Sequence, residues 1–340
     1  MGLNNKKLTV YILGAGASYA SNATEYKIPV QKGFFARIAS IFPPISVFPI
    51  FHDIQMSQWL ASRGYGSISD PAAILKTNHD LNLEDFYSEI ENDTGVDEAT
   101  RQAILKVLDR TIFQAVSTPV VAMRQHREKT CFYHKYLAKK LRSGDSVVSF
   151  NYDSLIDDAM LYYCSGWHPL TGHGVEFDEV YGKIVPKKAA PFKSSMLLLK
   201  PHGSVTFRYN DTESKSKTKL RYLGFNSGLS PLNMSMGGGW EPFIVPPSSS
   251  KSSHQSYMSS ILEIAKNKIS NAKKLIVIGY SFPANDTHIN QLFEFFNGQL
   301  FVVNPDWNSE FYLSRIEQLG LRIDKGYSYF EDFTGKPNQV

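Results

Sequence analysis

Five short apolar runs, each followed at once by small or polar residues, constrain the fold of this chain more than any other feature. The runs and the residues that follow them are 8–13 before Gly14, 146–150 before Asn151, 195–200 before His202, 274–278 before Gly279 and 300–303 before Asn304. Such runs are typical of strands buried on both faces. Helical patterns lie between some of them, for example over 154–163 and 287–296. The alternation predicts an α/β fold, Rossmann-like, with a mainly parallel sheet and helices on both faces.

The polar clusters follow the predicted strands instead of preceding them. In an open parallel sheet, ligands bind beyond the carboxyl ends of the strands, where the strand order reverses. We therefore expect the clusters to share one crevice. They are Gly14–Ser18, Asn151–Asp153, His202–Ser204, Gly279–Ser281 and Asn304.

Two segments do not fit the strand pattern. Residues 45–128 contain amphipathic helical patterns, with apolar positions such as Leu105 and Leu108, and are predicted to be a helical insertion. Residues 208–240 are polar and glycine-containing, and are predicted to be an irregular, partly mobile insertion. Both lie within one predicted domain spanning residues 1–340.

Composition excludes several classes of protein. Hydrophobic residues make up 42% of the chain and charged residues 20%, which is typical of a globular protein. No apolar run approaches the roughly 20 residues needed to cross a bilayer. The net charge of +4 is thinly spread, which argues against direct binding of nucleic acid. Cys131 and Cys164 form no CxxC motif, so no cysteine zinc site is expected, and a reducing cytoplasm fits.

The first run could also be a secretion signal, because Lys6 and Lys7 precede it. Thr9 and Tyr11 interrupt its apolar character, and two glycines follow it. A buried parallel strand is therefore the preferred interpretation.

The sequence Gly14-Ala15-Gly16 could bring backbone amides close to a phosphate at a helix N-terminus. A dinucleotide fingerprint would need a third glycine at position 19, which is Tyr19, and this disfavours a dehydrogenase. The alternative is a tight turn between strand and helix with no ligand.

Three polar residues after the middle strands could carry chemistry. Asn151 could bind sugar hydroxyls or orient a water, and Asp153 could bond an amide or cap the next helix. His202 lies between a proline and a glycine on a stiff turn, where it could act as a general base or be an ordinary loop histidine. Ser281 and Asn304 could bond a phosphate and a ribose, or lie in plain loops.

The order of these motifs resembles the sirtuin-like family, in particular its bacterial NAD-consuming branch of antiphage defence. The matching pieces are GAGAS at 14–18, IP at 28–29, NYD at 151–153, HGS at 202–204, VPP at 245–247, GYSF at 279–282 and VVNP at 302–305. They span most of the chain.

The resemblance implies a role for each matching residue. It implies catalysis by Asn151, which orients the ribose and water, by Asp153, which contacts the nicotinamide carboxamide, and by His202, which acts as base. It also implies NAD⁺ contacts from Gly14, Ala15, Gly16, Ser18, Pro29, Gly203, Gly279, Ser281 and Asn304.

Two departures from deacylating sirtuins bear on the activity. The chain has only two cysteines, too few for the four-cysteine zinc ribbon, so no metal is expected. The arginine usual after the IP proline is also absent. The resemblance therefore implies hydrolysis of NAD⁺ to ADP-ribose and nicotinamide. A protein deacylase and a catalytically silent scaffold that binds NAD or ADP-ribose stay open as alternatives.

An NAD⁺ hydrolase that is always active would kill its host, so the resemblance also implies gating. The switch should be a partner protein, an oligomeric assembly or the helical insertion. We expect a homo-oligomer, with residues 45–128 as a candidate contact surface. An activating partner encoded nearby would be an ATPase, a nuclease-like protein or a phage-sensing protein. No membrane association is expected.

Overall fold

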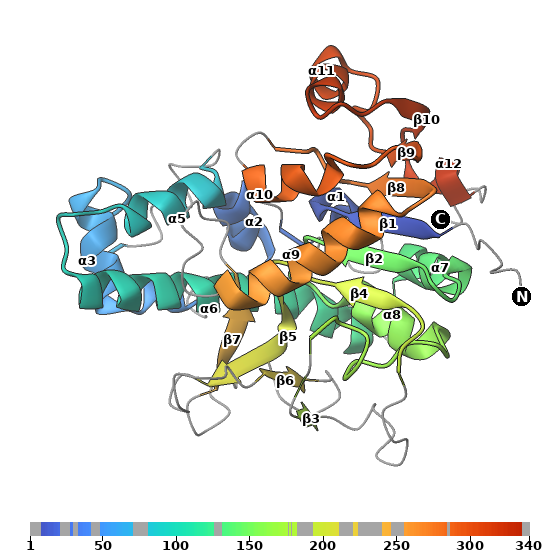
Figure 1. The fold of residues 1–340 in the computed structure, drawn as a ribbon. Coiled ribbons are helices and arrows are strands. Elements are labelled where there is room, and N and C mark those ends of the chain that lie inside the picture. Colours follow the sequence, from blue (N-terminus) through green and yellow to red (C-terminus); the bar gives the residue numbers. More distant parts are fainter. Residues whose placement is uncertain are drawn as a thin grey trace, which may run out of the picture.

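The computed structural model describes residues 8–20, 28–29, 33–41, 48–70, 81–125, 131–175, 177, 179–181, 193–210, 220–223, 240–245, 255–283 and 286–334. At its centre lies a six-stranded sheet in the order β10-β9-β8-β1-β2-β4, with every pair parallel (Figure 1). Its strands are β1 (Thr9–Leu13), β2 (Ser146–Ser149), β4 (Leu197–Leu199), β8 (Lys274–Ile278), β9 (Gln299–Val303) and β10 (Ile323–Tyr327). The predicted parallel sheet is confirmed, and its five predicted strands are neighbours in it. β10 adds an edge strand that the sequence pattern did not indicate.

Both faces of this sheet are covered. Side chains of successive residues in a strand point to opposite faces. In β1, Tyr11 and Leu13 belong to one buried apolar cluster, whereas Val10 and Ile12 belong to another. The first cluster includes residues of the helices α6 (Glu98–Gln125), α7 (Phe132–Lys140) and α8 (Leu155–Tyr163), and the second includes residues of α9 (Gln255–Ser270) and α11 (Glu310–Gln318). The expected helices on both faces are therefore present.

The described residues of 45–128 form helices joined by turns and short irregular stretches, with one isolated β-bridge between Ser67 and Asp70. These helices are the 3₁₀ segment η2 (Pro49–Phe51), α3 (Ile54–Ser62), α5 (Leu83–Glu91) and α6. Two of them begin at capping side chains, because Asp53 accepts from the Met56 amide and Asn82 from the Glu84 amide, both at 2.9 Å. Figure 1 shows α3, α5 and α6 grouped to one side of the sheet. The boundaries of this segment stay a prediction.

A second, smaller sheet lies beside the first, in the order β3-β6-β5-β7. Its strands are β3 (Glu179–Tyr181), β5 (Gly203–Asn210), β6 (Leu220–Leu223) and β7 (Trp240–Ile244), and β5 runs antiparallel to both β6 and β7. The range 208–240 thus contains β6 and the ends of two further strands. Its residues 211–219 and 224–239 lie outside the described ones, so the predicted mobility is not tested. Short strands whose partners are remote in sequence leave little periodic signal.

The remaining helices are short. They are α1 (Ala15–Tyr19), α2 (Phe34–Ile41), α10 (Thr287–Asn290), the 3₁₀ segment η4 (Gln291–Phe293) and α12 (Phe330–Thr334). In the described ranges, no helix combines the length and the apolar character that crossing a bilayer requires.

Candidate functional site

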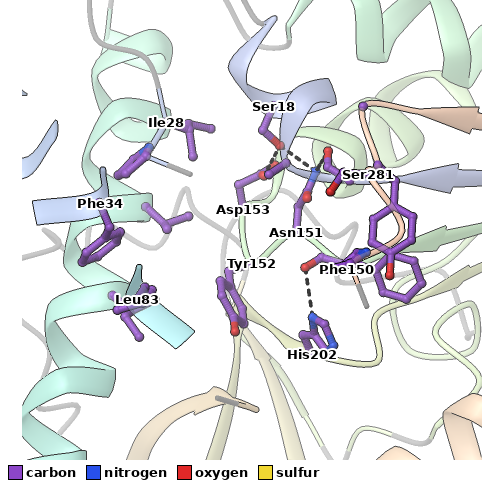
Figure 2. Close-up of a pocket in the computed structure, with 18 of the residues that line it drawn as sticks. Ser18, Ile28, Phe34, Leu83, Phe150, Asn151, Tyr152, Asp153, His202 and Ser281 are labelled. Carbon is purple, nitrogen blue, oxygen red and sulfur yellow. Dashed lines mark hydrogen bonds between the residues drawn. The ribbon is translucent and has the colours of Figure 1, made fainter. Parts of the chain in front are cut away.

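A cavity lies at the carboxyl edge of the six-stranded sheet, between the turns that follow β1, β2, β4 and β8 (Figure 2). Its volume is about 130 Å³. The lining residues are Gly14, Ala15, Ser18, Ile28, Pro29, Phe34, Leu83, Ile112, Val116, Phe150, Asn151, Tyr152, Asp153, His202, Gly279, Tyr280, Ser281, Pro283 and Asp286. The chain therefore brings most of the predicted polar clusters to one hollow, as the parallel strand pattern suggested.

The two glycine turns of this cavity fit against each other without side chains between them. The Gly14 amide donates to the Ile278 carbonyl and the Gly16 amide to the Gly279 carbonyl, both at 2.9 Å. A Cβ on Gly14 would lie 2.5 Å from the Gly279 oxygen, and one on Gly279 would lie 2.3 Å from the Ala17 nitrogen. The close packing of the two backbones is therefore enough to explain why Gly14 and Gly279 are glycines. The Gly16 amide is already occupied, whereas Ala15 is exposed and lines the cavity.

Gly279→Ala should lower the free energy of unfolding by about 2–4 kcal/mol, because it combines a left-handed φ of +62° with this backbone clash. Gly320→Ala is a matched control, since Gly320 has a φ of +69° but no atom within 4 Å of an added Cβ. That control should cost only about 1 kcal/mol. Urea denaturation followed by circular dichroism measures both. Equal losses in the two variants would show that the interlocked turns contribute nothing.

Three polar side chains form a hydrogen-bonded group along one wall of the cavity. Asn151 Nδ2 donates to the Gly14 carbonyl at 2.8 Å and to Ser18 Oγ at 2.7 Å, and Ser18 Oγ donates to Asp153 Oδ2 at 2.5 Å. All three residues are buried. Asp153 Oδ1 also accepts from the Leu155 amide at 2.9 Å, at the start of α8. The sequence left two roles open for Asp153, a cap of the next helix or a residue of the binding site. In the structure Asp153 both accepts from the first amide of α8 and lines the cavity.

His202 lies on the turn between β4 and β5, on the same side of the cavity. Its Nδ1 is 3.3 Å from the Phe150 carbonyl, and its ring is 5.6 Å from the Phe150 ring and 6.3 Å from the Tyr152 ring. Gly203, the next residue, has a φ of +74°. A side chain cannot fit there, because a Cβ would lie 2.3 Å from the Phe243 carbonyl oxygen. The turn is therefore fixed by backbone packing, which holds the imidazole beside the cavity.

The turn after β8 is strained. Phe282 is a buried non-glycine residue with a φ of +52°. Arg315 of α11 holds this turn through a bond of 2.7 Å from its Nε to the Phe282 carbonyl. Strained backbone of this kind often persists where it positions functional groups. Here it presents the exposed side chain of Ser281 to the cavity.

The opposite wall of the cavity is apolar. Ile28, Phe34 and Leu83 lie across from Asn151 and Asp153 (Figure 2). Ile112 and Val116 of α6 complete this wall and are spaced one helical turn apart. No sequence pattern singles out these residues, because apolar positions on an amphipathic helix do not reveal whether they face a core or a cavity. The aromatic residues that follow the strands, such as Phe150 and Tyr280, stood next to predicted site residues and could have been found.

Three predicted residues do not line the cavity: Gly16, Gly203 and Asn304. The side chain of Asn304 instead contacts neighbouring backbone, with its Oδ1 accepting from the Asp306 amide at 2.9 Å. Pro29 lines the cavity and is buried.

A group of buried charges lies next to the polar wall, and no pattern in the sequence indicated it. Lys200 Nζ donates to the Asp153 carbonyl and, at 3.0 Å, to Asp157 Oδ2. Both charged side chains are fully buried. His173 Nε2 lies 3.9 Å from the other oxygen of Asp157, and Tyr257 donates to the Lys200 carbonyl at 2.8 Å. This network joins α8, which follows Asp153, to the turn that carries His202.

Two buried histidines, His134 and His173, contribute an acid-sensitive part of the stability. Burial lowers the pKa of His173 to about 4, against a raising influence of Asp157, and burial likewise lowers the pKa of His134 to about 4. An unfolded histidine takes up its proton near pH 6.5, so between about pH 6.5 and 4 the unfolded chain binds more protons. The contribution of these two histidines to stability should therefore be constant above about pH 7 and fall on acidification, by about 3 kcal/mol for each histidine once the pH is below about 4.

His173→Gln tests this acid sensitivity, because glutamine retains polar atoms but does not titrate. The variant should lose less stability than the wild type between pH 7 and pH 5 in urea denaturation. His288→Gln, at an exposed histidine, is the control and should behave like the wild type. An unchanged pH dependence in His173→Gln would contradict the assignment.

Among the described residues, no group of three or more His, Cys, Asp or Glu side chains is placed to hold a metal ion. Cys131 and Cys164, both described, are not joined by a disulfide.

No family model matches the sequence, and neither does any curated protein. Several solved structures are similar to the chain. They include a Sir2 homologue in complex with NAD, at 14% identity and TM-score 0.45, covering 97% of this chain and 87% of that chain. A structure of Sir2 with a p53 peptide and NAD⁺ has 17% identity and TM-score 0.40, and the match covers 98% of this chain and 92% of that chain. A sirtuin structure described as the structural basis of sirtuin substrate affinity has 15% identity and TM-score 0.44, and the match covers 98% of this chain and 93% of that chain. The observed strand order, and not these likenesses, defines the fold class.

Proposed function

We propose that this chain is an NAD⁺ glycohydrolase that cleaves NAD⁺ to ADP-ribose and nicotinamide. The observation that carries the proposal is the two-sided cavity at the carboxyl edge of the sheet. Asn151, Asp153 and His202 form its polar side, and apolar side chains from residues 28–34 and from the helical segment form the other.

The size of the cavity supports binding of one ring of the substrate. Its volume of about 130 Å³ is close to that of an apolar cavity of roughly 150 Å³ that accommodates benzene. The apolar wall suits the face of the nicotinamide ring. Asp153 offers a carboxylate that can accept from the nicotinamide carboxamide. Ala15 is an exposed residue of the glycine turn and lines the cavity, and its backbone amide is the proposed donor to a diphosphate.

The proposed reaction breaks the bond between ribose C1′ and the nicotinamide nitrogen. Its electron pair goes to the nitrogen and neutralises the pyridinium, and positive charge develops on the ribose as in glycoside hydrolysis. A water oxygen then bonds to C1′ and loses a proton to His202. Asn151 positions the water and the ribose, so the products are nicotinamide, ADP-ribose and a proton.

We also propose that the enzyme is a gated effector of antiphage defence that acts in the cytoplasm. The gate would be assembly into a homo-oligomer or an activating partner protein. Exposed apolar side chains on the helical segment support a contact surface there, because Ile54 is 68% exposed and Ile68 is 60% exposed.

The test is nicotinamide release from NAD⁺ by the purified chain, measured by chromatography from nanomolar to tens of micromolar protein, alone and with proteins encoded beside it. Release without acyl-peptide, rising with assembly or partner, supports the proposal. Release only with an acyl-lysine peptide would identify a deacylase. Bound NAD⁺ with no release under any condition would identify a silent scaffold.

A further inference from the structure

A second and larger cavity lies at the opposite edge of the six-stranded sheet, where the parallel strands begin. Its volume is about 730 Å³, which is within the usual range of roughly 300–1,000 Å³ for small-molecule sites. The lining residues are Thr9, Tyr11, Tyr136, Leu137, Lys140, Arg142, Ser143, Asp145, Lys273, Lys274, Ile276, Gln299 and Phe333. None of them lines the cavity at the carboxyl edge.

Strand register builds the floor of this cavity. Thr9 pairs with Lys274, and Lys274 pairs with Gln299, so the first rungs of β1, β8 and β9 lie side by side. Tyr11 and Ile276 form the next rung that faces the same way. Helix α7 contributes further lining residues and α12 contributes Phe333, and both helices lie by the starts of the strands in Figure 1.

The charge of the cavity favours anions. Four basic side chains line it, namely Lys140, Arg142, Lys273 and Lys274, against the single acidic Asp145. The Asp145 carboxylate already accepts from the Thr9 amide at 3.0 Å and the Arg142 amide at 2.9 Å. Within the described ranges, no carboxylate forms a salt bridge with any of the four cations. Lysine and arginine side chains are the usual protein partners of phosphate groups.

Aromatic rings stand beside these cations. Tyr11, Tyr136 and Phe333 line the cavity, and Lys140 Nζ lies 5.1 Å from the centre of the Tyr136 ring. Lys274 Nζ lies 4.3 Å from the centre of the Phe301 ring on the neighbouring strand. Flat rings next to cations suit a ligand that has both a planar base and phosphates.

We propose that this cavity binds a nucleoside polyphosphate, at a site separate from the cavity that holds Asn151 and His202. The cations would contact the phosphates, and the aromatic side chains would contact the base. The inference does not depend on the proposed function, because the two cavities lie at opposite edges of the sheet.

Isothermal titration calorimetry with ATP and with inorganic pyrophosphate tests the proposal. The test variant is Arg142→Gln/Lys273→Gln, which removes two exposed charges from the cavity. The control is Lys106→Gln/Lys266→Gln, which removes the same charge from residues of α6 and α9 that do not line this cavity. Asn151→Ala reports binding at the other cavity. Thermal denaturation checks that each variant is folded.

ATP should bind the wild type, and the test variant should bind it at least about tenfold more weakly. The control and Asn151→Ala should retain affinity within about twofold, and pyrophosphate should bind more weakly than ATP. No binding of ATP, an equal loss in the control, or a loss confined to Asn151→Ala would overturn the site. Equal affinity for ATP and pyrophosphate would overturn the assignment to a nucleotide.

Discussion

His202→Ala is expected to reduce nicotinamide release from NAD⁺ by about 100- to 10,000-fold, which is the usual contribution of general acid–base catalysis. The imidazole lies on the turn after β4, beside the cavity and against the Phe150 and Tyr152 rings. The turn owes its shape to Gly203 and the Phe243 backbone, so the variant should fold. Nicotinamide release and circular dichroism of the same samples provide the check.

His202→Ala should lower the turnover rate more than the affinity for NAD⁺, because His202 is proposed to act on the attacking water. His52→Ala, at an exposed histidine remote in sequence, should keep wild-type activity. Near-normal NAD⁺ cleavage by His202→Ala would show that the base assignment is wrong and that the histidine is structural.

Asn151→Ala should be about as inactive as His202→Ala, and the double variant hardly worse than either single one, because groups that act as a unit are not additive. The structure adds a second effect of this substitution. Asn151 Nδ2 also holds the Gly14 carbonyl and Ser18 Oγ, so its loss loosens the glycine turn. NAD⁺ affinity and stability of Asn151→Ala should therefore both fall more than those of His202→Ala.

Lys200→Met should lower the free energy of unfolding by about 3–5 kcal/mol, the usual loss when one partner of a buried ion pair is removed. The substitution leaves Asp157 fully buried without the cation that lies 3.0 Å from it. It also removes the donor to the Asp153 carbonyl. Urea denaturation followed by circular dichroism measures the loss.

A double variant, Lys200→Met/Asp157→Leu, should regain much of this stability, because it leaves no unpaired charge. Lys266→Met is the control, since Lys266 pairs with Glu294 at 3.2 Å on the surface and should contribute less than about 1 kcal/mol. A loss below about 1 kcal/mol for Lys200→Met would mean that the buried pair is dispensable for folding.

Much of the architecture could be predicted from local pattern. Apolar runs that end in polar residues predicted five parallel strands, and all five are neighbours in the sheet. Because parallel strands end at a common edge, the same pattern predicted that Gly14, Asn151 and His202 lie around one crevice, and all three line the cavity there. The roles of these residues stay predictions, since a pattern that places a side chain does not show what it binds.

Other features depend on contacts between segments remote in sequence. Lys200 would be expected at the surface, yet it is fully buried because Asp157 and the Asp153 carbonyl satisfy its charge. Ile112 and Val116 look like any apolar positions of an amphipathic helix, and only the approach of α6 to the sheet makes them a cavity wall. Gly16 suggested a phosphate cradle, but its amide contacts Gly279 from another turn. The sequence thus determined the strands and the polar edge they share, through periodicity and turn chemistry. Tertiary packing decided which buried groups support that edge, because burial and pairing depend on neighbours that no local pattern specifies.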